Sequence, residues 1–239
     1  ERDSGGAGDP LLPLAAPGVA SLKRALLQLH ERYLEDTLDQ PQGREGSTAC
    51  VAAIDAGARR VHVANVGDSR CVLCAADGSV RALSVDHKPD RPDELARINA
   101  LGGEVRQRRR GVPRVYWREQ YGRAGGLAMS RAIGDTFYLQ LVPSVPEVLA
   151  APLLPGDALV LGTDGLWDEM SDHDACAHVR ARLDAAARRT NEPGHDIMAQ
   201  PRALAQSLVH AALERGSTDN VTAIVVLVDE PKRPHAATA

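Results

Sequence analysis

Residues 47–85 alternate short apolar runs with turn signals, and this pattern limits the chain to folds that contain β-sheet. The apolar positions include Val51, Val61 and Val63, and the runs are broken by Asp55-Ala56-Gly57, Gly67-Asp68 and Asp77-Gly78. Turn residues at such intervals join neighbouring antiparallel strands. We therefore expect an antiparallel meander in this part of the chain.

Helical periodicity flanks the meander on both sides. Apolar residues recur every three or four positions over residues 22–33, and Ser21 is available as the N-cap of a helix that should end before Pro41. A short helix is expected at about residues 92–100, followed by an arginine-rich, irregular region through Gly125.

The C-terminal part of the sequence predicts two more helices and two strands. One helix begins near Ser171 with Asp174 as its capping-box partner, and the other carries Leu204 and Leu208 and stops at Gly216. Strands are expected at residues 158–161 and 221–228. This order of elements predicts an α+β fold in which α-helices pack on antiparallel β-sheets.

Length and composition favour a single domain. The chain has 239 residues, of which 44% are hydrophobic, enough for one sizeable core. The glycine- and proline-rich residues 1–20 are interpreted as a flexible linker, residues 21–230 as the domain, and residues 231–239 as a disordered tail.

Charge and cysteine content exclude several classes of function. A net charge of -4 gives no overall electrostatic signal for nucleic acid or an anionic membrane, and the longest apolar run is too short to span a bilayer. Cys71 and Cys74 should point to opposite faces of a strand. We interpret the cysteines as small core residues in a reducing compartment, and expect a cytoplasmic or nuclear protein that is monomeric by default.

Four aspartates fall at the ends of predicted strands. Asp68 and Asp164 each follow a strand, Asp168 lies one turn beyond Asp164, and Asp219 precedes the last strand. If that strand runs antiparallel to the others, all four carboxylates share one edge of the fold. A site of carboxylates without histidine or thiolate suits Mg²⁺ or Mn²⁺. Taken singly, each aspartate is a weak signal: Asp164-Gly165 is more often a turn than a ligand site, and the other aspartates can be explained as turn or cap residues.

Six motifs carry a more specific signal, because they occur in the order in which one family has them. That family is protein phosphatase 2C, which the chain resembles over about residues 46–228. The motifs are Gly46-Ser47-Thr48-Ala49, Ala64-Asn65-Val66-Gly67-Asp68-Ser69-Arg70, Asp86-His87-Lys88-Pro89, Ser130-Arg131-Ala132-Ile133-Gly134-Asp135, Thr163-Asp164-Gly165-Leu166-Trp167-Asp168 and Ser217-Thr218-Asp219-Asn220-Val221-Thr222.

The resemblance implies two packed antiparallel β-sheets flanked by α-helices, and hydrolysis of phosphoserine and phosphothreonine in proteins by a water activated between two Mg²⁺ or Mn²⁺ ions. Asp164 and Asp219 match carboxylates that hold one of these ions. Asp68, with Asp164 and Asp168, resembles the ligands of a weaker third ion. The resemblance gives no catalytic residue in this sequence beyond these ligands. Thr48 and Asn220, and the arginines Arg70 and Arg131, are expected to have structural roles.

The sequence departs from the family pattern upstream of these motifs. The family's acidic residue, phosphate-binding arginine and Asp-Gly-His-Gly motif have no counterpart in residues 1–45. We therefore expect a phosphatase domain that lacks its first strands and first helix and is a weak catalyst alone. The alternatives are a catalytically inactive phosphatase-like domain that binds proteins, and an unrelated α+β binding domain with aspartates in its turns.

The arginine-rich segment, residues 106–123, leaves three interpretations open. A solvated loop is the simplest, and the family's variable flap, which would dock phosphorylated or acidic protein segments, is the second. Nucleic-acid binding through the interleaved arginines and aromatic residues is the least favoured. The predicted partners are therefore phosphorylated proteins, with neither nucleic acid nor membrane.

Overall fold

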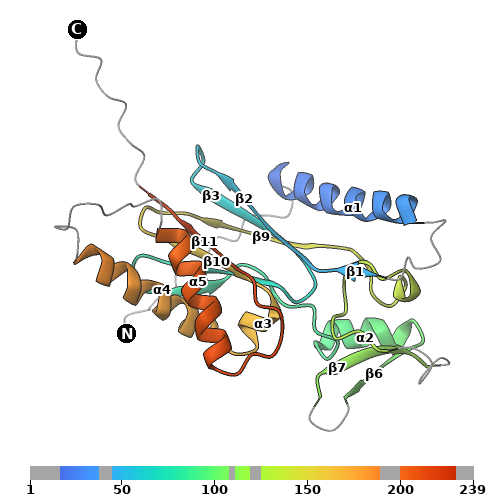
Figure 1. Cartoon of the computed structure of the whole chain (residues 1–239). Coiled ribbons are helices and arrows are strands. Elements are labelled where there is room, and N and C mark those ends of the chain that lie inside the picture. Colours follow the sequence, from blue (N-terminus) through green and yellow to red (C-terminus); the bar gives the residue numbers. More distant parts are fainter. Residues whose placement is uncertain (1–16, 38–44, 108–110, 119–124, 189–199, 230–239) are drawn as a thin grey trace, which may run out of the picture.

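Two antiparallel sheets pack face to face in the computed structural model, and helices cover both outer faces (Figure 1). The structure describes residues 17–37, 45–107, 111–118, 125–188 and 200–229. One sheet has the strand order β11-β10-β4-β5 and the other the order β2-β3-β9. This arrangement confirms the predicted α+β class.

The four-stranded sheet consists of β4 (Arg70–Cys74), β5 (Val80–Ala82), β10 (Ala158–Gly162) and β11 (Ala223–Leu227). The three-stranded sheet consists of β2 (Ala49–Asp55), β3 (Arg60–Val66) and β9 (Glu147–Pro152). Alternate residues of β3 and β4 point into the core between the sheets, where Val61, Leu73 and Leu159 are buried. Both faces of β4 and β10 are covered, which explains their nearly continuous apolar sequences.

Helices complete the outer layers. The helix α1 (Pro17–Thr37) covers the three-stranded sheet, where its Leu26 packs against Ala64 and Val66. On the opposite side, α3 (Asp164–Trp167), α4 (Asp172–Ala187) and α5 (Gln200–Glu214) cover the four-stranded sheet (Figure 1).

A smaller unit lies at one end of the sheets (Figure 1). It contains α2 (Pro92–Ala100) and the hairpin of β6 (Gly103–Gln107) and β7 (Pro113–Trp117), with Ile98, Val115 and Leu141 in its core. The short strands β1 (Gly46–Ser47) and β8 (Ile133–Gly134) pair with each other, and the 3-10 helix η2 (Thr136–Tyr138) follows.

Several predicted boundaries agree with the structure. The helix α2 starts and ends where expected, and Ser171 and Asp174 form the predicted capping box at the start of α4. After α5, Gly216 adopts φ +109°, the left-handed conformation that ends helices. The helix α1 begins at Pro17, four positions before the expected Ser21. Residues 1–16 of the predicted linker and the tail 231–239 lie outside the described residues.

The predicted meander is wrong at one connection. β2–β3 and β4–β5 are antiparallel hairpins, but β3 and β4 do not pair with each other. The link Gly67-Asp68-Ser69 instead carries the chain from one sheet to the other. Gly67 has φ +103°, and a Cβ there would lie 2.4 Å from Thr48 Cγ2, so the crossing needs glycine at this position.

The arginine-rich region is also more ordered than predicted. Residues 103–107 and 113–117 form the β6–β7 hairpin, in which Val115 and Tyr116 are buried. We did not predict this hairpin, because the charged residues around Val115 and Tyr116 obscure their apolar pattern in the sequence. Strand β9 lies in a stretch for which we predicted no strand.

The interpretation of the cysteines needs one correction. Cys71 and Cys74 do point into different cores, as expected, but Cys74 forms a disulfide with Cys176 across a Cα–Cα distance of 5.2 Å. The two residues are 102 positions apart in sequence, so spacing gave no sign of the pair. Cys50 and Cys71 are free thiols.

Two edge strands expose apolar side chains. β2 and β11 each have one neighbour among the described strands, and they carry Val51, Ile54 and Ile224 with relative exposures of 38%, 47% and 54%. Such edges can pair with other chains. Among the described helices, none is long and apolar enough to cross a membrane.

Candidate metal centre

The sheet topology brings the loops that carry the four aspartates to one edge. β4 and β11 both pair antiparallel with β10, and Gly162 is the register partner of both Arg70 and Ala223. The leading ends of β4 and β11 therefore flank the trailing end of β10. Asp68 lies just before β4, Asp164 just after β10 at the start of α3, and Asp219 just before β11. The sequence predicted that all four aspartates would share an edge, with Asp68 placed there by the strand before it. In the structure that strand, β3, belongs to the other sheet, and Asp68 reaches this edge at the start of β4.

Backbone contacts hold the loop of Asp164 against that of Asp219. A Cβ on Gly165 would lie 2.5 Å from the backbone oxygen of Asn220, so the two segments touch at this point. Ser217 Oγ donates to the Gly165 carbonyl at 2.9 Å, and Thr163 Oγ1 donates to the Asn220 carbonyl at 3.2 Å. The closeness of the two aspartates is therefore built into the backbone.

Asp68 is positioned by a separate set of contacts. Thr48 Oγ1 and Ser69 Oγ lie 2.8 Å apart, and the Gly67 N–H donates to Nδ1 of the fully buried His87 at 2.9 Å. The His87 N–H in turn donates to the Gly67 carbonyl at 3.0 Å. The Gly67–His87 bonds fix the crossing loop to the segment that follows β5, and the Thr48–Ser69 bond ties it to the residue before β2.

Lys88 supplies a cation to this edge. Its Nζ donates to Asp68 Oδ2 at 2.7 Å, and the Asp68 side chain is only 3% exposed. Burial alone would lower the pKa of Lys88. The hydrogen bond and charge of Asp68, together with the charges of Asp168 and Asp86, have the larger effect, so the pKa is raised overall. Lys88 is therefore an ammonium group at neutral pH.

The electrostatics of Asp164 show that the carboxylates interact. Burial raises its pKa, and the charges of Asp68 and Asp219 raise it further, while Lys88 opposes the shift. A bound cation would stabilise a cluster of carboxylates of this kind, because it relieves their mutual repulsion.

The other two aspartates are exposed: Asp168 lies at the end of α3, and Asp219 lies before β11. Asp219 Oδ1 accepts a hydrogen bond from the Asn220 N–H at 2.6 Å, and Asp164 Oδ1 accepts one from the Gly165 N–H at 2.9 Å.

A tighter carboxylate group lies elsewhere. Oxygens of Asp93, Glu94 and Glu147 lie within 4.8 Å of one another, closer than any three of the candidate aspartates in the described part of the chain. This group already has its cations. Arg91 contacts all three carboxylates, and Arg97 and Arg131 both bind Glu94 at 2.6 Å. We interpret it as a structural ion-pair network, because a metal would have to displace several guanidinium groups.

The structure agrees with the structural roles expected for two arginines. Arg70 forms a bidentate pair with Asp86, bonds Asp172 at 2.7 Å and lies over the Trp167 ring. Arg131 bonds Glu94 and the Val145 carbonyl, which ties α2 to the segment before β9.

Sequence reasoning missed the roles of His87 and Lys88. Both belong to a motif that we recognised, Asp86-His87-Lys88-Pro89, but we assigned neither a function. A lysine next to a buried histidine gives no sign of its partner until the fold brings it to Asp68, which lies 20 positions away.

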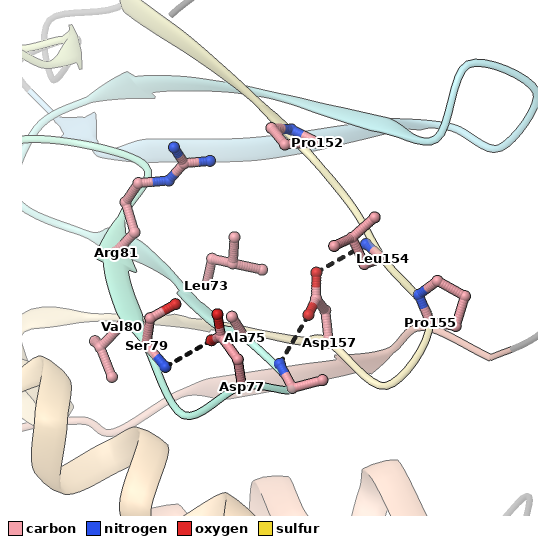
Figure 2. Close-up of a pocket in the computed structure, with 11 residues that line it drawn as sticks. Leu73, Ala75, Asp77, Ser79, Val80, Arg81, Pro152, Leu154, Pro155 and Asp157 are labelled. Carbon is pink, nitrogen blue, oxygen red and sulfur yellow. Dashed lines mark hydrogen bonds between the residues drawn. The ribbon is translucent and has the colours of Figure 1, made fainter. Parts of the chain in front are cut away.

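Two depressions help to locate the site. One of about 250 Å³, lined by Thr48, Ser69, Thr163 and Thr222 among others, adjoins the loops that carry the aspartates. A larger one, of about 470 Å³, lies at the opposite ends of β4 and β10 (Figure 2). There, Asp157 and Asp77 accept backbone hydrogen bonds from Ala76 and Ser79, so these carboxylates hold turns together.

Comparison with known proteins decides the family. The family model of protein phosphatase 2C matches residues 14–221. The chain belongs to the protein phosphatase 2C family. The match confirms the resemblance inferred from the six motifs.

Relatives in the protein phosphatase 2C family extend beyond the matched region. Protein phosphatase 2C 50 of Oryza sativa subsp. japonica is 43% identical over 189 residues, which cover 76% of this chain and 46% of that protein. Probable protein phosphatase 2C 24 of Arabidopsis thaliana is 41% identical over 184 residues, covering 76% and 47%. The chain thus matches a little under half the length of these relatives.

Solved structures show the same fold. A sex determining protein of C. elegans superposes with a TM-score of 0.71 at 25% identity, covering 90% of this chain and 47% of that one. A serine-threonine phosphatase 2C from Toxoplasma gondii has a TM-score of 0.68 at 25% identity, covering 86% and 66%.

Proposed function

We propose that this chain carries the carboxylate half of a metal-dependent protein serine/threonine phosphatase. The observation that supports it most is the arrangement of Asp68, Asp164 and Asp219 at one sheet edge, where burial, and then the charges of Asp68 and Asp219, raise the pKa of Asp164. Phosphorylated proteins are the substrates proposed from the family, and a monomer is the default state.

The donor set suits hard divalent ions. The four aspartates offer oxygen ligands, and neither cysteine nor histidine is among them, which favours Mg²⁺ or Mn²⁺ over Zn²⁺. We assign Asp164 and Asp219 to one ion of a pair, and Asp68, Asp164 and Asp168 to a weaker third ion. Ions bound there would lower the pKa of a water and neutralise charge on the phosphoryl oxygens.

The residues around the aspartates prepare the site before any ion binds. The Gly165–Asn220 contact sets the separation of the Asp164 and Asp219 loops, and the Gly67–His87 bonds hold Asp68 in place. Arg70 keeps α4 against the same edge through Asp172. Because these supports are rigid, the aspartates lose little freedom on binding a cation.

A second candidate function follows from the sequence. No Asp-Gly-His-Gly segment occurs in the 239 residues, so the family's bridging carboxylate and its histidine are not supplied by this chain. Without those two residues, the chain acting alone would bind an ion weakly. Its function would then be to bind proteins rather than to hydrolyse phosphoesters.

Hydrolysis of a phosphothreonine peptide, with and without Mn²⁺, separates the two candidates. The chain is compared with a chimera that carries the preceding segment of the Oryza relative, each with an Asp164→Ala counterpart. We expect Mn²⁺-dependent activity in the chimera, lost with Asp164→Ala. Inactivity of the chimera, if it is folded, would favour the binding module.

A further inference from the structure

One ammonium group stands among the proposed metal ligands. Lys88 Nζ lies 2.7 Å from Asp68 Oδ2 and also interacts electrostatically with Asp168 and Asp164. These are the three aspartates assigned to the weaker ion. In the part of the chain that the structure describes, Lys88 makes the sole ion pair recorded for any of them.

The position of Lys88 is fixed by its neighbours. His87, directly before it, is fully buried and bonded to Gly67, and the His87 carbonyl accepts a hydrogen bond from the Ser130 N–H at 2.8 Å. The Lys88 carbonyl accepts one from the Arg91 N–H at 3.1 Å. The Gly67–His87 bonds therefore hold the loop of Asp68 beside the segment of Lys88. Because both backbones are already fixed, little conformational entropy is lost when the two side chains pair.

The other nearby cation is already engaged. Arg70 directs its guanidinium group to Asp86 and Asp172, and it packs over Trp167. Asp68 is buried and depends on Lys88 for its ion pair. An unpaired carboxylate at this depth would be costly.

We propose that Lys88 is a built-in counter-ion that sets how weakly a divalent ion binds among Asp68, Asp164 and Asp168. Without metal, its ammonium group neutralises Asp68. A divalent ion in the same place meets a positive charge within a few ångströms and has to compete for a carboxylate oxygen. This inference rests on the proposed function, because it concerns the ion assigned to these aspartates.

The test is Mn²⁺ binding by the full chain, measured by the loss of the free Mn²⁺ paramagnetic resonance signal. We expect Lys88→Met to tighten the weakest binding step by about tenfold, since it removes like-charge repulsion at a partly buried site. Lys88→Arg keeps the charge and should stay within about twofold of the wild type. Lys23→Met, on the exposed face of α1, is the matched control and should have no effect.

A measurement on the unmodified chain complements the variants. Acetylation of lysine amines, mapped by mass spectrometry, should be slow at Lys88 without metal and faster when Mn²⁺ displaces its ammonium group, relative to Lys23. Unchanged or weaker Mn²⁺ binding in a folded Lys88→Met variant would overturn the inference, as would protection of Lys88 by Mn²⁺. If neither the wild type nor any variant binds Mn²⁺, the proposed metal site fails together with the inference.

Discussion

Gly165 and Asn220 are in contact through their backbones, because a Cβ on residue 165 would lie 2.5 Å from the Asn220 carbonyl oxygen. This contact joins the start of α3 to the loop before β11, and so joins Asp164 to Asp219. The spacing of two proposed metal ligands therefore depends on the absence of one side chain.

Gly165→Ala is expected to lower the free energy of unfolding by about 1–3 kcal/mol, because a methyl group would be forced against backbone that cannot move aside. Urea denaturation measures the loss. Gly57→Ala is the control, since its Cβ would lie 3.5 Å from the nearest atom, an ordinary contact. Equal stability of the two variants would refute the close approach.

Asp135 should make stability depend on pH. Burial raises its pKa to about 6, so the carboxyl proton of Asp135 is bound more tightly in the folded state than in the unfolded chain. The stabilisation is complete below the unfolded pKa of 3.8 and is lost as pH rises through about 6. Asp135→Asn removes this dependence and tolerates the left-handed backbone at φ 48°. Relative to the wild type, the variant should gain about 2–3 kcal/mol between pH 3.5 and pH 7. Parallel stability curves would contradict this.

The Glu94 ion pairs predict a large effect on stability. Burial raises the pKa of Glu94, but hydrogen bonds from Arg131 and Arg97 lower it more, so the carboxylate is ionised at neutral pH. Glu94→Gln removes the buried carboxylate that Arg97 and Arg131 share and should cost about 3 kcal/mol. Asp93→Asn, whose carboxylate is 61% exposed, should cost much less. Thermal unfolding of both variants at pH 7 provides the comparison, and similar losses would argue against the network.

The Cys74–Cys176 disulfide links β4 to α4 across 102 residues. Closing so long a loop restricts the unfolded chain, so Cys176→Ser should lower the free energy of unfolding by about 2–4 kcal/mol under non-reducing conditions. A reductant that breaks the disulfide should lower the free energy of unfolding of the wild type to about that of Cys176→Ser. Cys50→Ser, which changes a free thiol, serves as the control. A wild type with four free thiols in a thiol titration would disprove the link.

The exposed edge strand β11 predicts aggregation at high protein concentration. Ile224 is 54% exposed on a strand with no neighbour on one side among the described strands, so Ile224→Lys should reduce aggregation by adding a charge to the edge. Leu29→Lys alters an equally exposed residue on helix α1 and is expected to have a smaller effect. Static light scattering against protein concentration distinguishes the two.

The sequence predicted the elements better than their arrangement. Local signals such as the Ser171–Asp174 capping box and Gly216 placed helix ends correctly, because the physical cause lies within a few residues. The crossing at Gly67 was misread as a meander turn, since glycine followed by aspartate suits both. The Cys74–Cys176 pair depends on contacts 102 residues apart and left no local pattern.

The candidate site followed the same division. The strand ends predicted that Asp68, Asp164, Asp168 and Asp219 would share one edge. The pairing of β10 with β11 accounts for Asp164 and Asp219, whereas Asp68 comes to this edge through β4 and not through the strand before it. The role of Lys88 was not predicted, because Lys88 meets Asp68 only when the segment after β5 folds back against the Gly67-Asp68-Ser69 link. Asp93, Glu94 and Glu147 form the tightest carboxylate group in the described residues. Their arginine partners are Arg97 in α2, Arg91 directly before α2 and Arg131 before β8.

Mn²⁺ binding by the two carboxylate groups is the most direct test of the proposed metal centre. Isothermal titration of the full chain is compared with that of Asp164→Asn and Asp93→Asn. We predict that Asp164→Asn weakens Mn²⁺ binding at least tenfold, about 1.4 kcal/mol, while Asp93→Asn leaves it unchanged. Binding that survives Asp164→Asn and is lost with Asp93→Asn would place the metal in the ion-pair network and contradict the account.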